Sequence, residues 1–172
     1  METQNNHTAT LSAPLFISPS DLLSSWLGHR RLTKRVIEAF PEDKFFDYSI
    51  GGMRTFADMM KEILDISGPG VKGIATDEWP AGSNWDHNAK AVASTKAEFL
   101  ALWDDATEQI SAYWPQISEE RFQENVLAFG MYDGQAFSTI LYFIDNEIHH
   151  RAQGTVYLRS LGIEPPAFWN RD

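Results

Sequence analysis

One stretch near the C-terminal end of the sequence, residues 133–162, constrains the fold more than any other. It opens with Asp133, a residue type that often caps the start of a helix, and it closes with Gly162, a type that often follows the end of one. The roughly 28 residues between them contain no proline, and as a helix they would extend about 40 Å. We therefore predict that the last element of the chain is one long helix.

This predicted helix carries a polar cluster, residues 146–153, where a bundle helix ordinarily carries aliphatic side chains. At about 100° per residue, His150 falls near the middle of the apolar face that includes Phe143, whereas His149 falls roughly 100° away. Asn146 lies one turn before His150, on the edge of the same face. We therefore expect His150 to point into the bundle with Asn146 beside it, and His149 to face solvent or a partner.

Two further members of the cluster, Glu147 and Arg151, also lean inward at a spacing of four residues, which predicts a partly buried ion pair. The inward histidine itself has two interpretations. It is either a core histidine satisfied by a neighbouring carboxylate or carbonyl group, or a metal ligand that projects from a bundle helix. The pattern of residues leaves both interpretations open.

Composition excludes several classes of protein. The chain has 172 residues and is 43% hydrophobic, which suits one globular domain with a substantial core. Cysteine is absent, which removes disulfides, thiolate zinc sites and a cysteine nucleophile, and is compatible with a reducing cytoplasm. The net charge of −10 argues against nucleic-acid and anionic-membrane surfaces, and no apolar run approaches the ~20 residues of a membrane span. We expect a cytoplasmic protein that binds neither nucleic acid nor membranes.

The chain divides into a predicted flexible tail, residues 1–17, and a single domain, residues 18–172. The domain opens with Ser-Pro-Ser-Asp at residues 18–21, a helix-capping sequence, and a helix is expected from there to Pro41. His29 lies among basic residues of this helix and is expected near the surface.

Two more helices are expected, one from about Met53 and one over residues 88–114. Gly-Pro-Gly at residues 68–70 would kink or end the first of them, and residues 68–88 would form a loop-rich connection. Residues 115–132 are expected to be irregular, with a possible short extended piece. Four long amphipathic segments without a convincing strand pattern predict an all-α fold, a four-helix bundle with long crossover connections.

The polar cluster, Asn-Glu-Ile-His-His-Arg-Ala-Gln at residues 146–153, resembles the His-Glu-Ile-His-His-Arg-Gly-Gln signature of the DinB/YfiT-like superfamily. Residues 53–58 and 29–33 are similar to other stretches of that family, so the resemblance covers most of residues 19–169. It implies a four-helix bundle, commonly a homodimer, in which three histidines hold a divalent metal. One of these histidines comes from the second helix and two come from the last.

This sequence departs from the family's ligand set. The position in the second helix falls on Glu62, which taken alone would be a solvated helix residue, and the first position in the last helix falls on Asn146. The resemblance thus implies Glu62, Asn146 and His150 as the residues that would hold a divalent metal, with Zn or Ni the first candidates. A neutral amide is a poor ligand for most transition metals, so the expected affinity is below that of a three-histidine site. Without metal, Glu62 would accept a hydrogen bond from Asn146 or protonated His150 in a structural polar network.

Two functions follow from the resemblance. The first is a metal-dependent thiol S-transferase, in which the metal lowers the pKa of a low-molecular-weight thiol cosubstrate and Tyr142, Tyr157 or Arg151 orients a small-molecule substrate. The second is a non-catalytic bundle that has lost the three-histidine site and acts as a small-ligand binding or stress-associated interaction protein. A hydrolase with a carboxylate pair is a less supported third alternative, because no nucleophile motif accompanies it. A homodimer is expected from the family, and because Tyr142, His149 and Val156 lie off the core face of the last helix.

Overall fold

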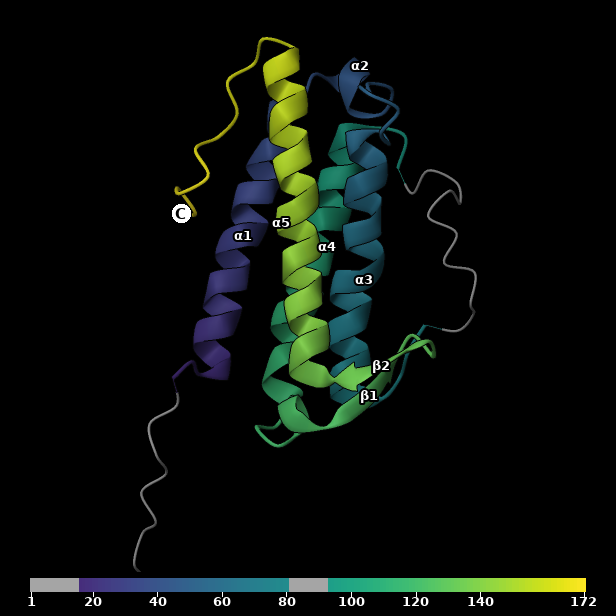
Figure 1. Cartoon of the computed structure of the whole chain (residues 1–172), viewed down its shortest axis with the longest axis vertical. Helices are drawn as coiled ribbons and strands as arrows, with labels where there is room; N and C mark the ends of the chain where they lie inside the picture. Colours follow the sequence, from purple (N-terminus) through teal and green to yellow (C-terminus); the bar gives the residue numbers. More distant parts are fainter. Residues whose placement is uncertain (1–15, 81–92) are drawn as a thin grey trace, which may run out of the picture.

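The structure, a computed structural model, describes residues 16–80 and 93–172. Four long helices lie side by side in it (Figure 1), and they confirm the predicted helical bundle. They are α1 (Pro19–Ala39), α3 (Phe56–Thr76), α4 (Lys96–Tyr113) and α5 (Ala136–Ser160). The short elements are α2 (Glu42–Phe45), the 3-10 turns η1 (Trp114–Gln116) and η2 (Arg121–Gln123), and the strands β1 (Asn125–Ala128) and β2 (Tyr132–Gln135).

The four long helices do not follow one another up and down around the bundle. Helices α1 and α5 run in one direction and α3 and α4 in the other (Figure 1). Helix α1 packs against α4 and α5, and α3 packs against the same two helices from the opposite side. Because α3 and α4 are parallel neighbours, the end of α3 at Thr76 and the start of α4 at Lys96 lie at opposite ends of the bundle, as a long crossover connection requires.

The first helix begins and ends where the sequence predicts. The Ser18 side chain accepts the backbone N–H of Asp21 at 3.1 Å, and the Asp21 carboxylate accepts the backbone N–H of Ser18 at 3.2 Å. This reciprocal pair satisfies two donors that the first turn would otherwise leave unpaired. Helix α1 then ends at Ala39, two residues before Pro41, because the residue that precedes a proline is disfavoured in helical geometry.

Helix α3 continues through Pro69, so the predicted loop is wrong for residues 68–76. The reason is tertiary packing. A Cβ atom on Gly70 would lie 2.5 Å from the ring of Phe143, so only glycine lets this buried ring pack directly on the α3 backbone. Burial of a large aromatic side chain outweighs the unfavourable helix propensity of proline and glycine.

Helix α4 begins at Lys96, later than the predicted start near residue 88. Residues 81–92 lie outside the described residues, but the three residues just before Lys96 are already non-helical. The Thr95 side chain accepts the backbone N–H of Glu98, and the Glu98 carboxylate accepts the backbone N–H of Thr95. This reciprocal capping fixes the start of the helix.

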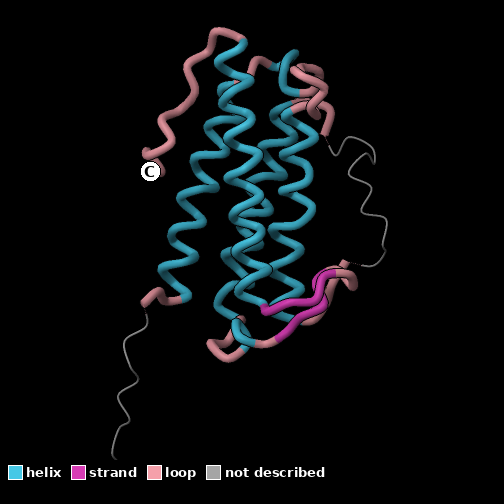
Figure 2. The backbone as a smooth tube through the Cα atoms, viewed as in Figure 1, coloured by secondary structure: helices cyan, strands magenta, loops and turns pink. Residues whose placement is uncertain are grey.

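A two-stranded antiparallel hairpin lies between α4 and α5, at one end of the bundle (Figure 2), so the fold is not purely helical. Strand β1 pairs with β2 in the register from Asn125 opposite Gln135 to Ala128 opposite Tyr132. In β1 the buried side chains alternate with exposed ones, which is the period of a half-buried strand. Strand β1 falls within residues 115–132, where the sequence indicates a possible short extended piece, whereas β2 was not expected.

The long C-terminal helix is confirmed, but its start lies later than Asp133, which belongs to β2. Helix α5 begins at Ala136, after Gln135, and no side-chain hydrogen bond caps it. Its other end follows the prediction, because Gly162 has a φ of +77°, the left-handed conformation that glycine adopts without strain. Among the described residues, no helix is long and apolar enough to cross a membrane.

A carboxylate, Glu147, is buried where α1, α4 and α5 meet. It is 0% exposed, and it accepts hydrogen bonds from Trp26 Nε1 at 3.1 Å and Thr33 Oγ1 at 2.7 Å. Its charged neighbour is Arg30, whose Nη1 lies 3.6 Å from Glu147 Oε2. The predicted direct pair with Arg151 is therefore wrong, since Arg151 reaches Glu147 only through Thr33.

His29 is buried at 6% exposure, which contradicts its predicted place near the surface. Arg151 Nη2 donates to His29 Nδ1 at 3.0 Å, and Arg151 Nη1 lies 3.3 Å from the backbone oxygen of His29. The basic neighbours of His29 along α1 gave no sign that α5 covers this part of the helix. Burial, together with the positive charge of Arg151, lowers the pKa of His29 to about 4.

Candidate functional site

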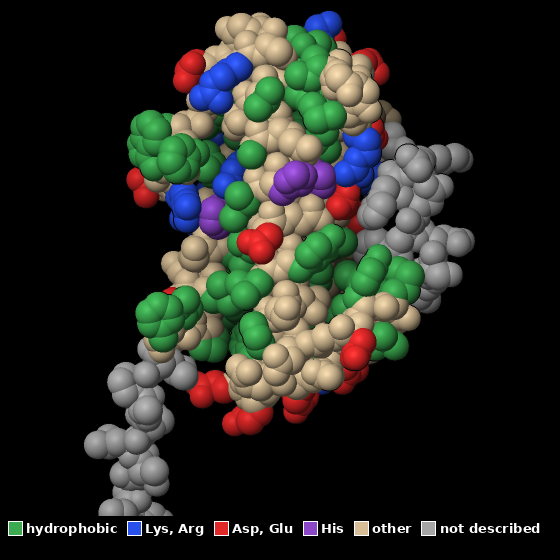
Figure 3. Space-filling model, in the orientation of Figure 1, with side chains coloured by type: hydrophobic (Ala, Val, Ile, Leu, Met, Phe, Trp, Pro, Cys, Tyr) green, Lys and Arg blue, Asp and Glu red, His purple; other side chains and the backbone are tan. Residues whose placement is uncertain are grey.

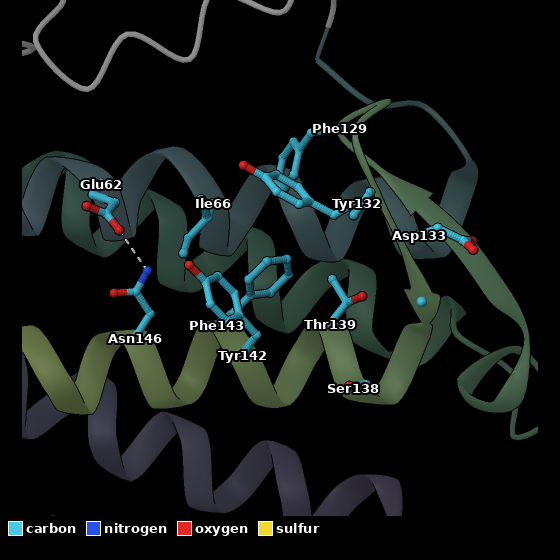
Figure 4. Close-up of a pocket in the computed structure, with 12 residues that line it drawn as sticks. Glu62, Ile66, Phe129, Tyr132, Asp133, Ser138, Thr139, Tyr142, Phe143 and Asn146 are labelled. Atoms are coloured by element: carbon cyan, nitrogen blue, oxygen red, sulfur yellow. Dashed lines mark hydrogen bonds between the residues drawn. The ribbon is translucent and has the colours of Figure 1, made fainter.

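The structure brings Glu62, Asn146 and His150 together between α3 and α5. Asn146 Nδ2 donates to Glu62 Oε1 at 2.8 Å (Figure 4), and His150 Nε2 lies 3.4 Å from the same oxygen. The Glu62 side chain is only 13% exposed, so it is not the solvated residue that its own helix suggests. The antiparallel packing of α3 on α5 places it opposite the polar cluster.

His150 faces the bundle and His149 faces outward, as the helical periodicity predicts. The His150 ring is 6% exposed, and its Nδ1 lies 2.7 Å from the side-chain oxygen of Gln153. Because an amide oxygen can only accept, the Nδ1–H group of His150 donates to Gln153. Nε2 is therefore the atom that turns toward Glu62.

Arg54 is a fourth member of this cluster, which the sequence reasoning did not assign to the site. It lies two residues before the start of α3, and its Nη2 lies 2.7 Å from Glu62 Oε2 and 3.3 Å from His150 Nε2. The guanidinium group thus bridges the carboxylate and the imidazole. Its place just outside a predicted helix gave no indication of this contact.

Hydrogen bonds to Glu62 hold the pKa of its carboxyl group well below its usual range. The bond with His150 contributes most, and those from Asn146 and Arg54 add to it, whereas partial burial acts in the opposite direction. Glu62 is therefore ionised at neutral pH. On the face of the molecule drawn in Figure 3, histidine, basic and acidic side chains adjoin one another at mid-height.

As arranged, these side chains do not fit a divalent metal. An ionised carboxylate can only accept hydrogen bonds, so Asn146 directs its N–H donor, not its oxygen, at Glu62. The positive charge of Arg54 lies against both Glu62 and His150, and it repels a second cation there. Across residues 16–80 and 93–172, no group of three or more His, Asp or Glu side chains could hold a metal ion.

A cavity of about 310 Å³ adjoins Glu62 and Asn146, between α3, α5 and the hairpin (Figure 4). Among the described residues, four aromatic and two aliphatic side chains form much of its wall, while carboxylates, hydroxyls and an amide supply its polar groups. The aromatic residues are Phe129, Tyr132, Tyr142 and Phe143.

Of the three residues proposed to orient a substrate, only Tyr142 lines this cavity. Arg151 turns toward α1, where it contacts His29. The Tyr157 side chain is buried, and its hydroxyl donates to the backbone oxygen of Arg54 at 2.8 Å. Tyr157 thus fixes the backbone of the arginine that binds Glu62, and it lies outside the cavity wall.

Comparison with known proteins identifies relatives of this fold. The family model described as "DinB family" matches residues 1–171. A DinB-like protein from Bacillus subtilis has a crystal structure similar to this one, with a TM-score of 0.63 and 18% identity, covering 88% of this chain and 99% of that one. A DinB-like protein from Bacillus cereus gives a TM-score of 0.71 and 13% identity, covering 90% of this chain and 100% of that one. At these identities the two structures show the fold alone, and no curated protein matches the sequence.

Proposed function

The chain belongs to the DinB family, and from that premise we propose that it is a small-molecule binding protein whose site works without a metal ion. One observation carries this proposal. The Arg54 guanidinium contacts both Glu62 and His150, and so supplies the positive charge that a metal would bring to this position.

The hydrogen bonds that Arg54 and Asn146 make to Glu62 favour the arrangement without a metal ion, because a metal would have to break them. A divalent ion would have to displace Arg54 from Glu62, and a hydrogen bond between charged groups contributes about 1.5–3 kcal/mol. Its loss would weaken metal binding by about ten- to a hundredfold. The amide of Asn146 would also have to turn its oxygen toward the ion and give up its hydrogen bond to Glu62.

The cavity beside this cluster supports the ligand-binding part of the proposal. Its volume of about 310 Å³ is within the range of small-molecule pockets in proteins. Such pockets combine apolar walls with a few polar groups, and here the aromatic side chains provide the walls while Glu62 and Asn146 provide polar groups at one end.

Metal titration of protein purified without a histidine tag tests the proposal. We expect elemental analysis to find no stoichiometric Zn or Ni, and calorimetry to find no stoichiometric binding of either ion to the wild type. Arg54→Met removes the competing charge and is expected to bind Zn more tightly than the wild type does. Arg159→Met, which changes an exposed arginine elsewhere on α5, is the matched control and is expected to behave as wild type.

The opposite result would overturn the proposal. Stoichiometric binding of Zn or Ni by the wild type, lost in both Glu62→Gln and His150→Ala, would favour the metal-dependent thiol S-transferase that the family resemblance implies. In that case a low-molecular-weight thiol would be the next compound to titrate.

A further inference from the structure

The cavity beside Glu62 has an unbalanced charge. Two of its lining residues carry carboxylates: Glu62 at one end, and Asp133 at the hairpin end, where the carboxylate is directed away from the centre of the cavity (Figure 4). Within the described part of the chain, no lysine or arginine is among the lining residues. Arg54 pairs with Glu62 from outside this lining. Asp133 has no ion pair or side-chain hydrogen bond with any described residue, so the hairpin rim of the cavity keeps one uncompensated negative charge.

The aromatic wall of the cavity adds to this negative potential. Tyr132 reaches across from β2 and Tyr142 rises from α5, with Phe143 beside it (Figure 4). Both tyrosines are more than half exposed, at 65% and 61%, so parts of their surfaces remain open to a ligand. The face of an aromatic ring is electronegative and attracts cations.

The negative charge of Glu62 also acts on Tyr142, one of the aromatic residues that line the cavity. Partial burial and then the negative charge of Glu62 raise the pKa of the Tyr142 hydroxyl. An anionic ligand would therefore meet the negative charge of Glu62, that of Asp133 at the rim, and no cation among the described lining residues. A cationic ligand would meet the open tyrosine rings in the field of the same two carboxylates.

We propose that this cavity binds an organic monocation with an apolar group, an aryl-alkyl amine or a quaternary ammonium compound. The inference rests on the proposed small-molecule function and names the chemical class of the ligand. The ammonium group faces Tyr132 and Tyr142 in the field of the two carboxylates, and the apolar group packs against Ile66 and Phe143. Aromatic side chains combined with carboxylates are a recurrent way of recognising ammonium groups.

Three compounds that share a phenyl group but differ in the charge of their polar group test the proposal at neutral pH. They are phenethylammonium (positive), phenethyl alcohol (neutral) and hydrocinnamate (negative). Calorimetric titration is expected to give binding of phenethylammonium about tenfold or more tighter than that of the alcohol, with hydrocinnamate weakest. Equal or tighter binding of the alcohol or of hydrocinnamate overturns the proposal. Absence of binding by all three probes overturns it as well.

Variants at exposed positions locate the effect without disturbing the fold. Asp133→Asn removes the uncompensated charge and is expected to weaken phenethylammonium about threefold while leaving the alcohol unchanged. Tyr132→Leu keeps an apolar wall but removes a ring face, and is expected to weaken the cation more than the alcohol. Glu164→Gln, an exposed carboxylate at the opposite end of the bundle, is the matched control. A loss in this control equal to that in Asp133→Asn would mean that only overall charge matters, and would overturn the proposal.

A cavity-filling variant separates failure of this inference from failure of the proposed function. Thr139 points into the cavity from α5, and Thr139→Phe would occupy it (Figure 4). If the alcohol or hydrocinnamate binds the wild type as tightly as the ammonium, and Thr139→Phe abolishes that binding, the cavity takes small molecules but has no preference for cations. The metal titration of Arg54→Met is independent of all three probes.

Discussion

Replacing Glu147 with glutamine removes one negative charge from the interior and leaves the side-chain shape almost unchanged. The carboxylate accepts two hydrogen bonds, from Trp26 and Thr33. A glutamine amide has one acceptor oxygen and one donor nitrogen, so one of these two donors would face an N–H group. Arg30 would at the same time lose its buried counter-charge.

The expected loss in the free energy of unfolding of Glu147→Gln depends mainly on Arg30. Its side chain is 1% exposed, stacks over the Trp103 ring at 3.5 Å and donates to the Trp103 backbone oxygen and to Thr107. Burial lowers the pKa of Arg30 to about 10, against the opposing effect of Glu147, so Arg30 stays charged at neutral pH. Removing one partner of a buried ion pair costs about 3–5 kcal/mol. For a chain of this size, that corresponds to a fall in Tm of roughly 10 °C.

Urea denaturation followed by circular dichroism and tryptophan fluorescence measures the change in the free energy of unfolding. Glu164→Gln makes the same chemical change at an exposed position and is expected to shift this free energy by less than about 0.5 kcal/mol. The double variant Arg30→Met/Glu147→Leu replaces the pair with apolar groups and is expected to recover most of the loss. A loss below about 1 kcal/mol in Glu147→Gln, or a double variant as unstable as the single one, would refute the reasoning.

Three further outcomes are expected. Gly154→Ala should destabilise the fold by about 1–3 kcal/mol, since its Cβ would lie 2.3 Å from the buried Phe56 ring, and an unchanged Tm would contradict this packing. His29→Asn keeps an acceptor for Arg151 but cannot titrate. The pKa of His29 is about 4 in the folded protein, below its usual value of about 6.5. The free energy of unfolding of the wild type therefore falls as the pH falls from 6.5 towards 4, and this group accounts for up to roughly 3 kcal/mol of the loss. The His29→Asn variant should not show this part of the loss. Urea titrations of both proteins at pH 7 and pH 4 measure the two pH dependences of the unfolding free energy. The same dependence in wild type and variant would contradict the lowered pKa of His29. Sedimentation is expected to find a homodimer, and a monomer at micromolar concentration would exclude it.

Features that depend on contacts within one helical turn follow directly from the sequence. The capping pair of Ser18 and Asp21 and the left-handed Gly162 occur where the residue types predict them. The inward turn of His150 follows from helical periodicity alone, because α5 is regular over its whole length. Each of these features requires only residues that are close along the chain.

Two local predictions fail where packing overrides propensity. Pro69 sits inside α3 because Gly70 lets the Phe143 ring pack against the helix backbone. Asp133 belongs to a hairpin strand and does not cap α5, because the backbone of residues 132–135 pairs with β1. The sequence indicated a possible extended piece near β1, but a strand is defined by its partner, and the four residues of β2 carry too little pattern to reveal that partner.

The sequence by itself determined the class of fold, the family and the face of the last helix that carries His150. Only the tertiary structure showed that Arg54 contacts both Glu62 and His150, and that Arg151 contacts His29. These contacts join helices that are far apart in the chain. Helical periodicity fixes which way each side chain points from its own axis, but the lateral position of one helix against the next decides which charges meet.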